Sequence, residues 1–273
     1  MREQYRRIGD HEIMILEDGI LFASPTLLSH VEGENGLAPH LQKLGEGNIP
    51  IVVNMFLIQG PGGVILIDSG LGGAQGPDFG KARLLLKEKG IGPDDVDHIL
   101  LTHFHTDHAE GLLYEDRSYF PRALVHYPPV DLAYFTNPEE RDKLPEARRA
   151  AFAVAARVVA AYAGRMAPID AGIVSLGFKS MPLPGHTPGH TGYLLDGQDE
   201  SLLIWGDVMH LDDRQAADTE LGLAFDIDLA RAAATRKLVV EQAARNDWVV
   251  AGSHIKGFNR FRRDGAGFVA EEA

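Results

Sequence analysis

Residues 101–111 read Leu-Thr-His-Phe-His-Thr-Asp-His-Ala-Glu-Gly. The stretch follows an apolar run that is typical of a buried strand, and it packs three histidines and one aspartate into six consecutive positions. Alternate side chains share a face of an extended backbone, so His103, His105 and Asp107 can converge, while His108 can reach a second centre if the chain turns there. This spacing indicates a metal site.

The donor types narrow the choice of metal. Imidazole and carboxylate groups suit zinc, manganese or iron(II). The chain contains no cysteine, which excludes thiolate sites. The absence of cysteine also fits a reducing cytoplasm, where disulfides are rare.

Composition favours an ordinary globular protein. The chain has 273 residues and is 45% hydrophobic, enough for a substantial core. Acidic side chains interrupt the segment behind the basic N-terminus, so neither a signal peptide nor a membrane span is expected. The formal net charge of −13 argues against a nucleic-acid partner, since phosphate binding draws on clustered lysine and arginine.

No linker or low-complexity tract divides the sequence, so we expect residues 1–273 to form a single domain. The Gly/Asn/Pro-rich segment 24–50 predicts a long loop, in which His30 and His40 have no partner at ligand spacing and are expected to be solvated. The segment 128–166 predicts a helical elaboration near the site. Its aromatic residues either line a substrate pocket or form an ordinary core stripe.

Local patterns predict several further elements. Ile51–Gln59 and Val64–Asp68, joined by Gly-Pro-Gly-Gly, are typical of a hairpin. A helix is predicted over Asp78–Lys89, because the pattern stops at a glycine, and another from Pro145. The second half begins with a predicted strand at Ile173–Leu176.

The second half repeats one arrangement of strand and loop. An apolar strand ends, a glycine follows, and a ligand-type side chain comes next: His186 in Pro-Gly-His-Thr-Pro-Gly-His, Asp207 in Trp-Gly-Asp, and His254 in Gly-Ser-His. Loops at one edge of a sheet converge in space even when they are remote in sequence. These residues are therefore candidates to complete the site.

The His-x-His-x-Asp-His motif at 103–108, the later His186, the Gly206-Asp207 pair and the late His254 together resemble the metallo-β-lactamase superfamily. The four motifs occur in the family's order, and the likeness extends from about residue 50 to about residue 260. The resemblance implies an α/β (α+β) fold, a four-layer αββα sandwich in which two mixed β-sheets are flanked by helices.

The resemblance also implies two divalent metal ions per chain, zinc first, with manganese, iron or cobalt as alternatives. One ion would be bound by His103, His105 and His186, the other by Asp107, His108 and His254, and Asp207 would bridge both. Asp68, at the strand end in Ile-Asp-Ser-Gly, is expected to hold a ligand imidazole in one tautomer, or else to form a turn.

Catalytic roles follow from the same resemblance. A metal-bridging hydroxide would be the nucleophile, because bound cations lower the pKa of water towards neutrality. Asp107 is the candidate proton donor to the leaving oxygen, and His210 is the alternative. The chain lacks a Gly-x-Ser-x-Gly elbow, which disfavours a serine triad. We expect His190 to be structural.

The substrate implied first is a small lactone or ester, because the sequence after Asp207 resembles the branch of lactonases and methyl-parathion-type hydrolases. Organophosphate or aryl ester hydrolysis and a glyoxalase II-like thioesterase are alternatives within the fold. A mononuclear iron dioxygenase and a non-catalytic metal-dependent binding module are alternatives of other classes. The expected partner is a small molecule, with neither nucleic acid nor membrane involved, and a homodimer is compatible with the sequence.

Overall fold

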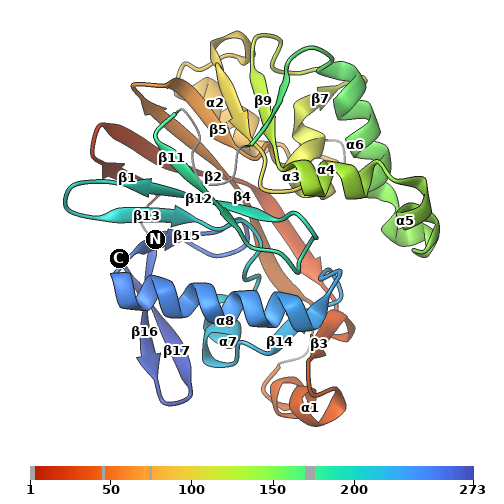
Figure 1. Ribbon diagram of the computed structural model, residues 1–273, viewed down its shortest axis with the longest axis vertical. Helices are drawn as coiled ribbons and strands as arrows, with labels where there is room; N and C mark the ends of the chain where they lie inside the picture. Colours follow the sequence, from red (N-terminus) through yellow and green to blue (C-terminus); the bar gives the residue numbers. More distant parts are fainter. Residues whose placement is uncertain (1–3, 45–46, 74–75, 170–175) are drawn as a thin grey trace.

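The computed structural model describes residues 4–44, 47–73, 76–169 and 176–273. Two sheets lie face to face between layers of helices (Figure 1). Helices α2 (Lys81–Glu88) and α6 (Ala150–Ala161) cover the first sheet, and α8 (Leu229–Asn246) covers the second. This is the αββα sandwich of two mixed sheets that the sequence predicted.

In the described part of the chain, the first sheet has seven strands in the order β1-β2-β4-β5-β6-β9-β10. Its first four strands pair antiparallel, and β5, β6, β9 and β10 pair parallel. The strands are Tyr5–Ile8, His11–Ala23, Ile49–Gly60, Gly63–Ile67, His98–Leu100, Leu124–Tyr127 and Met166–Pro168. β4 is almost continuously buried, as expected for a strand covered on both faces.

The second sheet has six strands among the described residues, in the order β11-β12-β13-β15-β16-β17. They are Phe178–Pro182, Thr191–Asp196, Ser201–Ile204, Val249–Ala251, Asn259–Asp264 and Gly267–Glu272. β13 and β15 run parallel, so the loops that follow them leave the same edge of the sheet. That edge carries two of the predicted ligands.

The hydrophobic core has one layer on each face of each sheet. Phe56 and Ile58 of the first sheet pack with Tyr193 and Ile204 of the second in the central layer. A second cluster lies under α2 and α6, and a third lies between the second sheet and α8. The two halves are thereby joined through their buried faces, and the loops at the sheet ends are left free to build a site.

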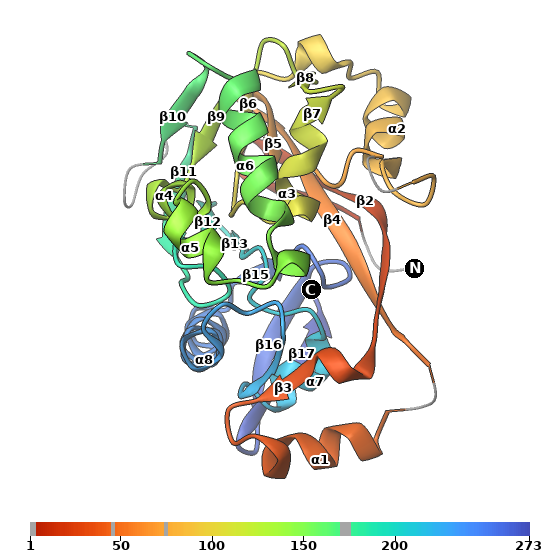
Figure 2. The ribbon, with the colours of Figure 1, turned by 90° about the vertical axis from the view of Figure 1, so that its right-hand side faces the viewer.

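Shorter helices and strands lie outside the two main sheets. The helices are α1 (Glu34–Gln42), α3 (Thr106–Ala109), α4 (Pro129–Phe135), α5 (Pro138–Asp142) and α7 (Asp212–Ala217). The strands are β3 (Leu28–His30), which pairs with β14 (Leu221–Leu223), and β7 (Leu113–Tyr114), which pairs with β8 (Arg117–Ser118). Figure 2 shows α1 beside β3, at the far end of the molecule from α2.

Segment 24–50 differs from the predicted long loop, because it contains β3 and the helix α1. The glycines and Pro39 of this segment hide the helix from a local pattern, and β3 forms only by pairing with a strand about 190 positions later. The hairpin of β4 and β5 is as predicted. The helix expected over 78–89 is α2. The strand expected at Ile173–Leu176 lies almost wholly outside the described residues.

The helix predicted from Pro145 instead begins with a 3-10 turn at Glu146–Arg148, and α6 starts at Ala150. Together with α4 and α5, it makes the segment 128–166 mainly helical.

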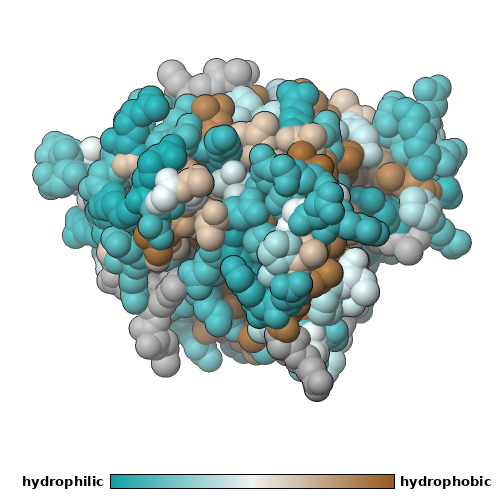
Figure 3. Space-filling view, turned by 90° about the horizontal axis from the view of Figure 1, so that it is seen from below, coloured by the Kyte–Doolittle hydropathy of each residue, from teal (hydrophilic) through white to brown (hydrophobic). Residues whose placement is uncertain are grey.

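Among the described residues, no helix has the length and apolarity needed to cross a membrane. The face seen in Figure 3 carries small hydrophobic patches scattered among hydrophilic residues.

Candidate metal centre

The motif that opens the sequence lies where β6 ends. The chain leaves the strand at Leu100, runs through His103 and His105, and turns into α3, which carries Asp107 and His108. His103 and His108 are fully buried, while His105 and Asp107 are half-buried. The turn into a helix sends His108 to a second group, as expected, but it also takes Asp107 there, away from His103 and His105, because Asp107 already lies in α3.

The second sheet fixes the position of this loop. Tyr193 on β12 donates a hydrogen bond from its hydroxyl to Leu101 O at 2.6 Å, and the Thr191 amide donates to Thr102 O at 3.0 Å. Asp131 on α4 also ties the two halves together, since its carboxylate accepts from the Phe104 amide and from the Gly189 amide. The motif is therefore held by residues remote from it in sequence.

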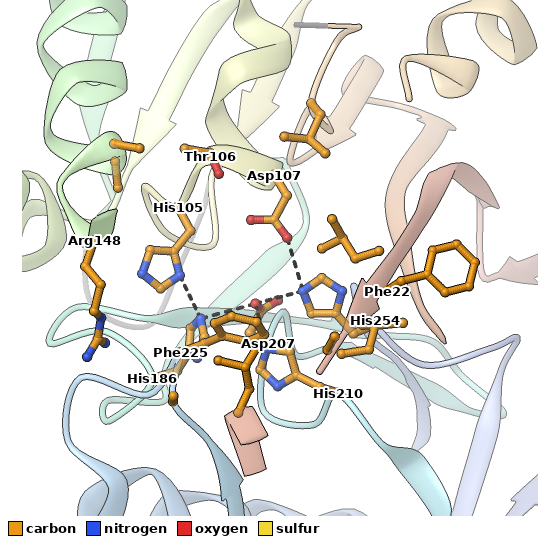
Figure 4. A pocket seen from close by; sticks show the side chains of 18 residues that line it. Phe22, His105, Thr106, Asp107, Arg148, His186, Asp207, His210, Phe225 and His254 are labelled. Atoms are coloured by element: carbon orange, nitrogen blue, oxygen red, sulfur yellow. Dashed lines mark hydrogen bonds and ion pairs between the residues drawn. The ribbon is translucent and has the colours of Figure 1, made fainter. Parts of the chain in front are cut away.

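The remaining predicted ligands arrive from three loops of the second half. His186 lies between β11 and β12, Asp207 follows β13, and His254 follows β15. All three are buried. Figure 4 shows His105, His186, Asp207 and His254 directed towards one another, with Asp107 adjacent to His254.

The structure brings all seven predicted side chains into two groups that share Asp207. Within each group, the candidate ligand atoms lie within 4.8 Å of one another. The groups are His103, His105, His186 and Asp207, and Asp107, His108, Asp207 and His254. The shortest separations include 2.9 Å between His105 Nδ1 and His186 Nε2, and 3.0 Å between His254 Nε2 and Asp207 Oδ2.

Buried polar atoms without hydrogen-bond partners indicate that the two groups fit cations. Among the described residues, His103 Nε2, His108 Nε2 and Asp207 Oδ1 are buried and have no hydrogen-bond partner. Leaving such atoms unpaired costs about 1–3 kcal/mol each, and all three belong to the two groups. Divalent cations at the two groups would satisfy them. The imidazole and carboxylate donors, with no cysteine, match the chemistry predicted from the sequence.

The electrostatics point the same way. Burial alone would raise the pKa of Asp107 and Asp207, but the neighbouring His108 and other imidazoles hold both pKa values well below the usual range. Burial lowers the pKa of His103 and His105 well below 6.5, so both rings are neutral donors. For His254, burial opposes charge but Asp207 outweighs it and raises the pKa to about 10. The cluster thus attracts positive charge.

Asp68 lies against the ring of His108, as expected for an orienting acid. His108 Nδ1 donates to Asp68 Oδ2 at 2.7 Å, which leaves Nε2 facing the centre. The Thr102 amide and hydroxyl each donate to Asp68 at 2.8 Å. The residue is fully buried at φ 59°, a left-handed conformation that these bonds hold in place.

His190 is buried and holds the turn that carries Asp207. Its Nδ1 donates to Leu183 O at 3.0 Å, and its Nε2 accepts from the Asp207 amide at 3.0 Å. Burial lowers the pKa of His190 to about 3, which keeps the ring neutral in this arrangement. Gly206 has φ 58°, and a Cβ there would lie 2.5 Å from His190 Nε2. The close approach requires glycine.

His210 faces the centre from the turn after Asp207. Its ring stacks on His254 with 4.6 Å between centroids, and its Nε2 lies 3.4 Å from Asp207 Oδ2. Burial lowers the pKa of His210 to about 4. The ring is therefore neutral near pH 7, and it can donate a proton only from its N–H group.

A cavity of about 540 Å³ opens above the two groups. Apolar side chains from the first strands and from the loop after β14 form much of its wall, notably Leu21, Phe22, Ile51 and Phe225. Arg148, from the turn before α6, supplies a cation on the opposite side from Phe22 (Figure 4). Sequence reasoning did not find Leu21 or Phe22, because they lie in an ordinary apolar strand with no local sign of the pocket.

Asp226 is a second buried acid that sequence reasoning missed. His186 Nδ1 donates to Asp226 Oδ1 at 2.9 Å. The residue precedes α8 by three positions, and nothing in its local sequence distinguishes it from the helix-capping Asp228. Only the fold brings it to a ligand.

His30 and His40 differ from the solvated residues that were expected. His30 is buried, and Nε2 of each ring bonds Asp218 Oδ2, at 3.1 and 2.9 Å. The Glu32 amide donates to His30 Nδ1, which places the proton of a neutral ring on Nε2. The trio is therefore a hydrogen-bonded cluster that ties α1 to the segment after α7.

Several proteins of known family resemble this chain in sequence or in fold. The chain is 25% identical over 189 residues to probable metallo-hydrolases of Mycobacterium tuberculosis and Mycobacterium bovis, an alignment that covers 59% of this chain and 58% of theirs. It thus spans less than two thirds of the length of these relatives. A crystal structure of the hydrolase AbOPH matches with a TM-score of 0.88 and 30% identity, covering 98% of this chain and 96% of that one.

AidC, a dizinc quorum-quenching lactonase solved with a product, has the same fold, with a TM-score of 0.88 and 23% identity over 98% of this chain and 96% of its own. The sequence model described as the Metallo-beta-lactamase superfamily matches residues 48–254 and so spans the region from β4 to the last predicted ligand. The chain belongs to the metallo-β-lactamase superfamily.

Proposed function

We propose that this chain is a binuclear metal-dependent hydrolase that opens a small lactone or ester. The observation that carries the proposal is the pair of ligand groups sharing Asp207 at the floor of an apolar cavity. His103, His105 and His186 would hold one ion, and Asp107, His108 and His254 the other. Zinc is the first choice for these nitrogen and oxygen donors, with manganese, iron or cobalt as alternatives.

When bound, two divalent cations supply a water of lowered pKa and an electrophile for the carbonyl oxygen. The carboxylate of Asp107 borders both the cavity and the second ligand group, with Oδ2 3.3 Å from His254 Nε2. Asp107 takes the proton of the attacking water and returns it to the leaving oxygen as the ring C–O bond breaks. The product is a hydroxy acid, and protons balance without another donor.

His210 is the alternative donor in this scheme. Its N–H can reach the leaving group because the ring lines the cavity beside Phe225. A neutral imidazole is a weak acid, so its contribution would be hydrogen bonding to the leaving oxygen rather than full proton transfer. Asp107 therefore remains the first candidate.

The apolar wall supports a lactone with a hydrocarbon substituent. Leu21 and Phe22 offer carbon surface in the cavity wall, with Phe22 on the side away from Arg148, and an acyl chain buried there gains about 0.8 kcal/mol per CH₂ group. AidC, described as a lactonase with its product bound, has the same fold, which adds support at the level of the scaffold.

The ligands come from loops of both sheets, which supports treating residues 1–273 as one functional domain. The lack of cysteine favours the cytoplasm as the compartment, because the protein needs no oxidising environment.

The test is turnover by the zinc-loaded chain on an acyl lactone, an aryl ester, a phosphotriester and a thioester. We expect the highest kcat/KM on the lactone. His103→Ala should lower turnover by at least about 10³-fold and reduce metal content together, since it removes a ligand. His98→Ala, a histidine outside both groups, is the matched control. Full activity in His103→Ala, or the phosphotriester as the best substrate, would contradict the proposal.

A further inference from the structure

His186 is held by a carboxylate that belongs to no ligand group. Its Nδ1 donates to Asp226 Oδ1 at 2.9 Å, so the lone pair of a neutral ring is on Nε2, which faces His105 and Asp207. The side chains of His186 and Asp226 are only 3% and 1% exposed. The orientation of this imidazole is therefore set from behind by a buried acid.

A buried carboxylate needs a partner, and Arg236 on α8 provides one. Arg236 Nη2 lies 3.4 Å from Asp226 Oδ2, and the arginine is only 1% exposed. Burial lowers the pKa of Arg236, while Asp226 acts to raise it. At 3.4 Å the contact is a long ion pair, so other contacts must hold the guanidinium in place.

Three backbone carbonyl oxygens supply those contacts. Arg236 donates to Val208 O at 2.7 Å, to Thr219 O at 2.8 Å and to Leu221 O at 2.7 Å. Val208 directly follows Asp207, and Leu221 begins β14, whose end leads to Asp226. One guanidinium thus contacts the orienting acid and the segment that carries the shared ligand.

A glycine in strand β14 leaves room for the carboxylate of Asp226. A Cβ at Gly222 would lie 2.9 Å from Asp226 Oδ2, which is closer than side-chain carbons approach. The Asp226 amide bonds Leu223 O, and the Ile227 amide bonds His186 O, which ties the loop to the ligand through the backbone as well. Both the side chain and the main chain of this loop therefore act on His186.

We propose that Asp226 and Arg236 are positioning residues that set the affinity of the metal site containing His186. The inference rests on the proposed function, because it assumes that the site holds a cation. Asn at position 226 could still accept from His186, but its amide N–H groups would face the donors of Arg236, and the negative charge would be lost. Lysine at 236 keeps the charge but cannot bond three carbonyls and a carboxylate in one plane.

The experiment measures zinc binding to the full chain by competition with a chromophoric chelator. Asp226→Asn should lower the zinc affinity of the site containing His186 by about 10–100-fold and leave the affinity of the other site near its wild-type value. Arg236→Lys should lower the affinity of the same site by a smaller factor. Circular dichroism of the metal-free variants checks that they fold. If Asp226→Asn does not fold, the zinc affinities of Arg236→Lys provide the test.

Arg165→Lys is the matched control. Arg165 also bonds backbone carbonyls, those of Phe120, Ala123 and Ala161, but none lies in a loop that carries a ligand. It should lower the melting temperature without changing zinc affinity, as a purely structural arginine would.

The inference would be overturned if both variants, Asp226→Asn and Arg236→Lys, fold and bind two zinc ions with wild-type affinities. It would also be overturned if the zinc affinity fell equally at both sites. Those results leave the proposed function intact if wild type binds two zinc ions and turns over a lactone. Wild type that binds no zinc would contradict the proposed function itself, and this inference with it.

Discussion

Two buried acids stand behind the centre, one from each half of the molecule, and they are held differently. Asp68 accepts from His108 at 2.7 Å and Asp226 accepts from His186 at 2.9 Å, so both fix a ring with Nε2 facing inwards. Asp68 is otherwise bonded to the neutral amide and hydroxyl of Thr102. Asp226 is paired with the guanidinium of Arg236.

The difference concerns charge as well as geometry. A carboxylate surrounded by neutral donors lends its full negative charge to the imidazole that it orients, whereas Arg236 offsets the charge of Asp226. The first half should therefore contribute more to cation affinity through its acid, and the second half should contribute chiefly through alignment.

The largest effect is expected from Asp68→Asn. Either orientation of the new amide sets an N–H group against a donor of Thr102 or of His108, so the ring of His108 loses its alignment together with the charge. We expect the affinity for the ion bound with His108 to fall by about 100-fold, which is the upper end of the range expected for Asp226→Asn at its own site. Zinc competition on both variants measures this. An effect smaller than that of Asp226→Asn would reverse the comparison.

A smaller effect is expected from Thr102→Val, which keeps the shape but removes a hydroxyl that donates to Asp68 and also bonds His103 Nδ1 at 3.0 Å. One lost hydrogen bond to a charged group is worth about 1.5–3 kcal/mol, and the remaining bonds to Asp68 keep the loss near the lower bound. Zinc affinity should fall by about tenfold at the site containing His108, and the site containing His103 should weaken as well, because that ring loses its hydrogen-bond partner. Thr102→Ser restores the hydroxyl and serves as the control. Unchanged affinity in Thr102→Val would show that the Thr102 amide alone holds Asp68.

The smallest effect is expected on the stability of the first half of the molecule, at His126, which lies away from the metal centre. Burial, assisted by His98, lowers the pKa of His126 on β9 to about 4. The unfolded chain binds this proton below about pH 6.5, so stability is fully present above that pH and falls as pH drops towards 4. Allowing for solvent screening, the loss is roughly 1 kcal/mol.

His126→Gln should make that part of the pH profile of the free energy of unfolding less steep, as measured by urea titration of the metal-free chain. Comparison of the two acids by zinc affinity is therefore best made near pH 7, where the scaffold is intact. An unchanged slope between pH 6.5 and pH 4 would contradict this account of His126.

The resemblance carried by the motifs at 103–108, 186, 207 and 254 predicted the fold class and the seven candidate ligands, and the structure brings those side chains together. Asp68 was singled out at the strand end in Ile-Asp-Ser-Gly, with an orienting role and a turn-forming role both left open. Asp226 and Arg236 were not, since a buried ion pair between a loop and a helix has no local pattern. The helix α1 was missed because Gly36 and Pro39 favour a loop, and β3 depends on a distant partner strand.

The most direct test of the central claim is the metal-to-chain ratio of the purified, zinc-loaded protein, determined by mass spectrometry of the metal against protein concentration. If Asp207 joins two ligand groups into one binuclear centre, the ratio is two in wild type and falls below one in Asp207→Ala. A ratio of one, with iron as the metal, or two ions retained in Asp207→Ala, would contradict the account.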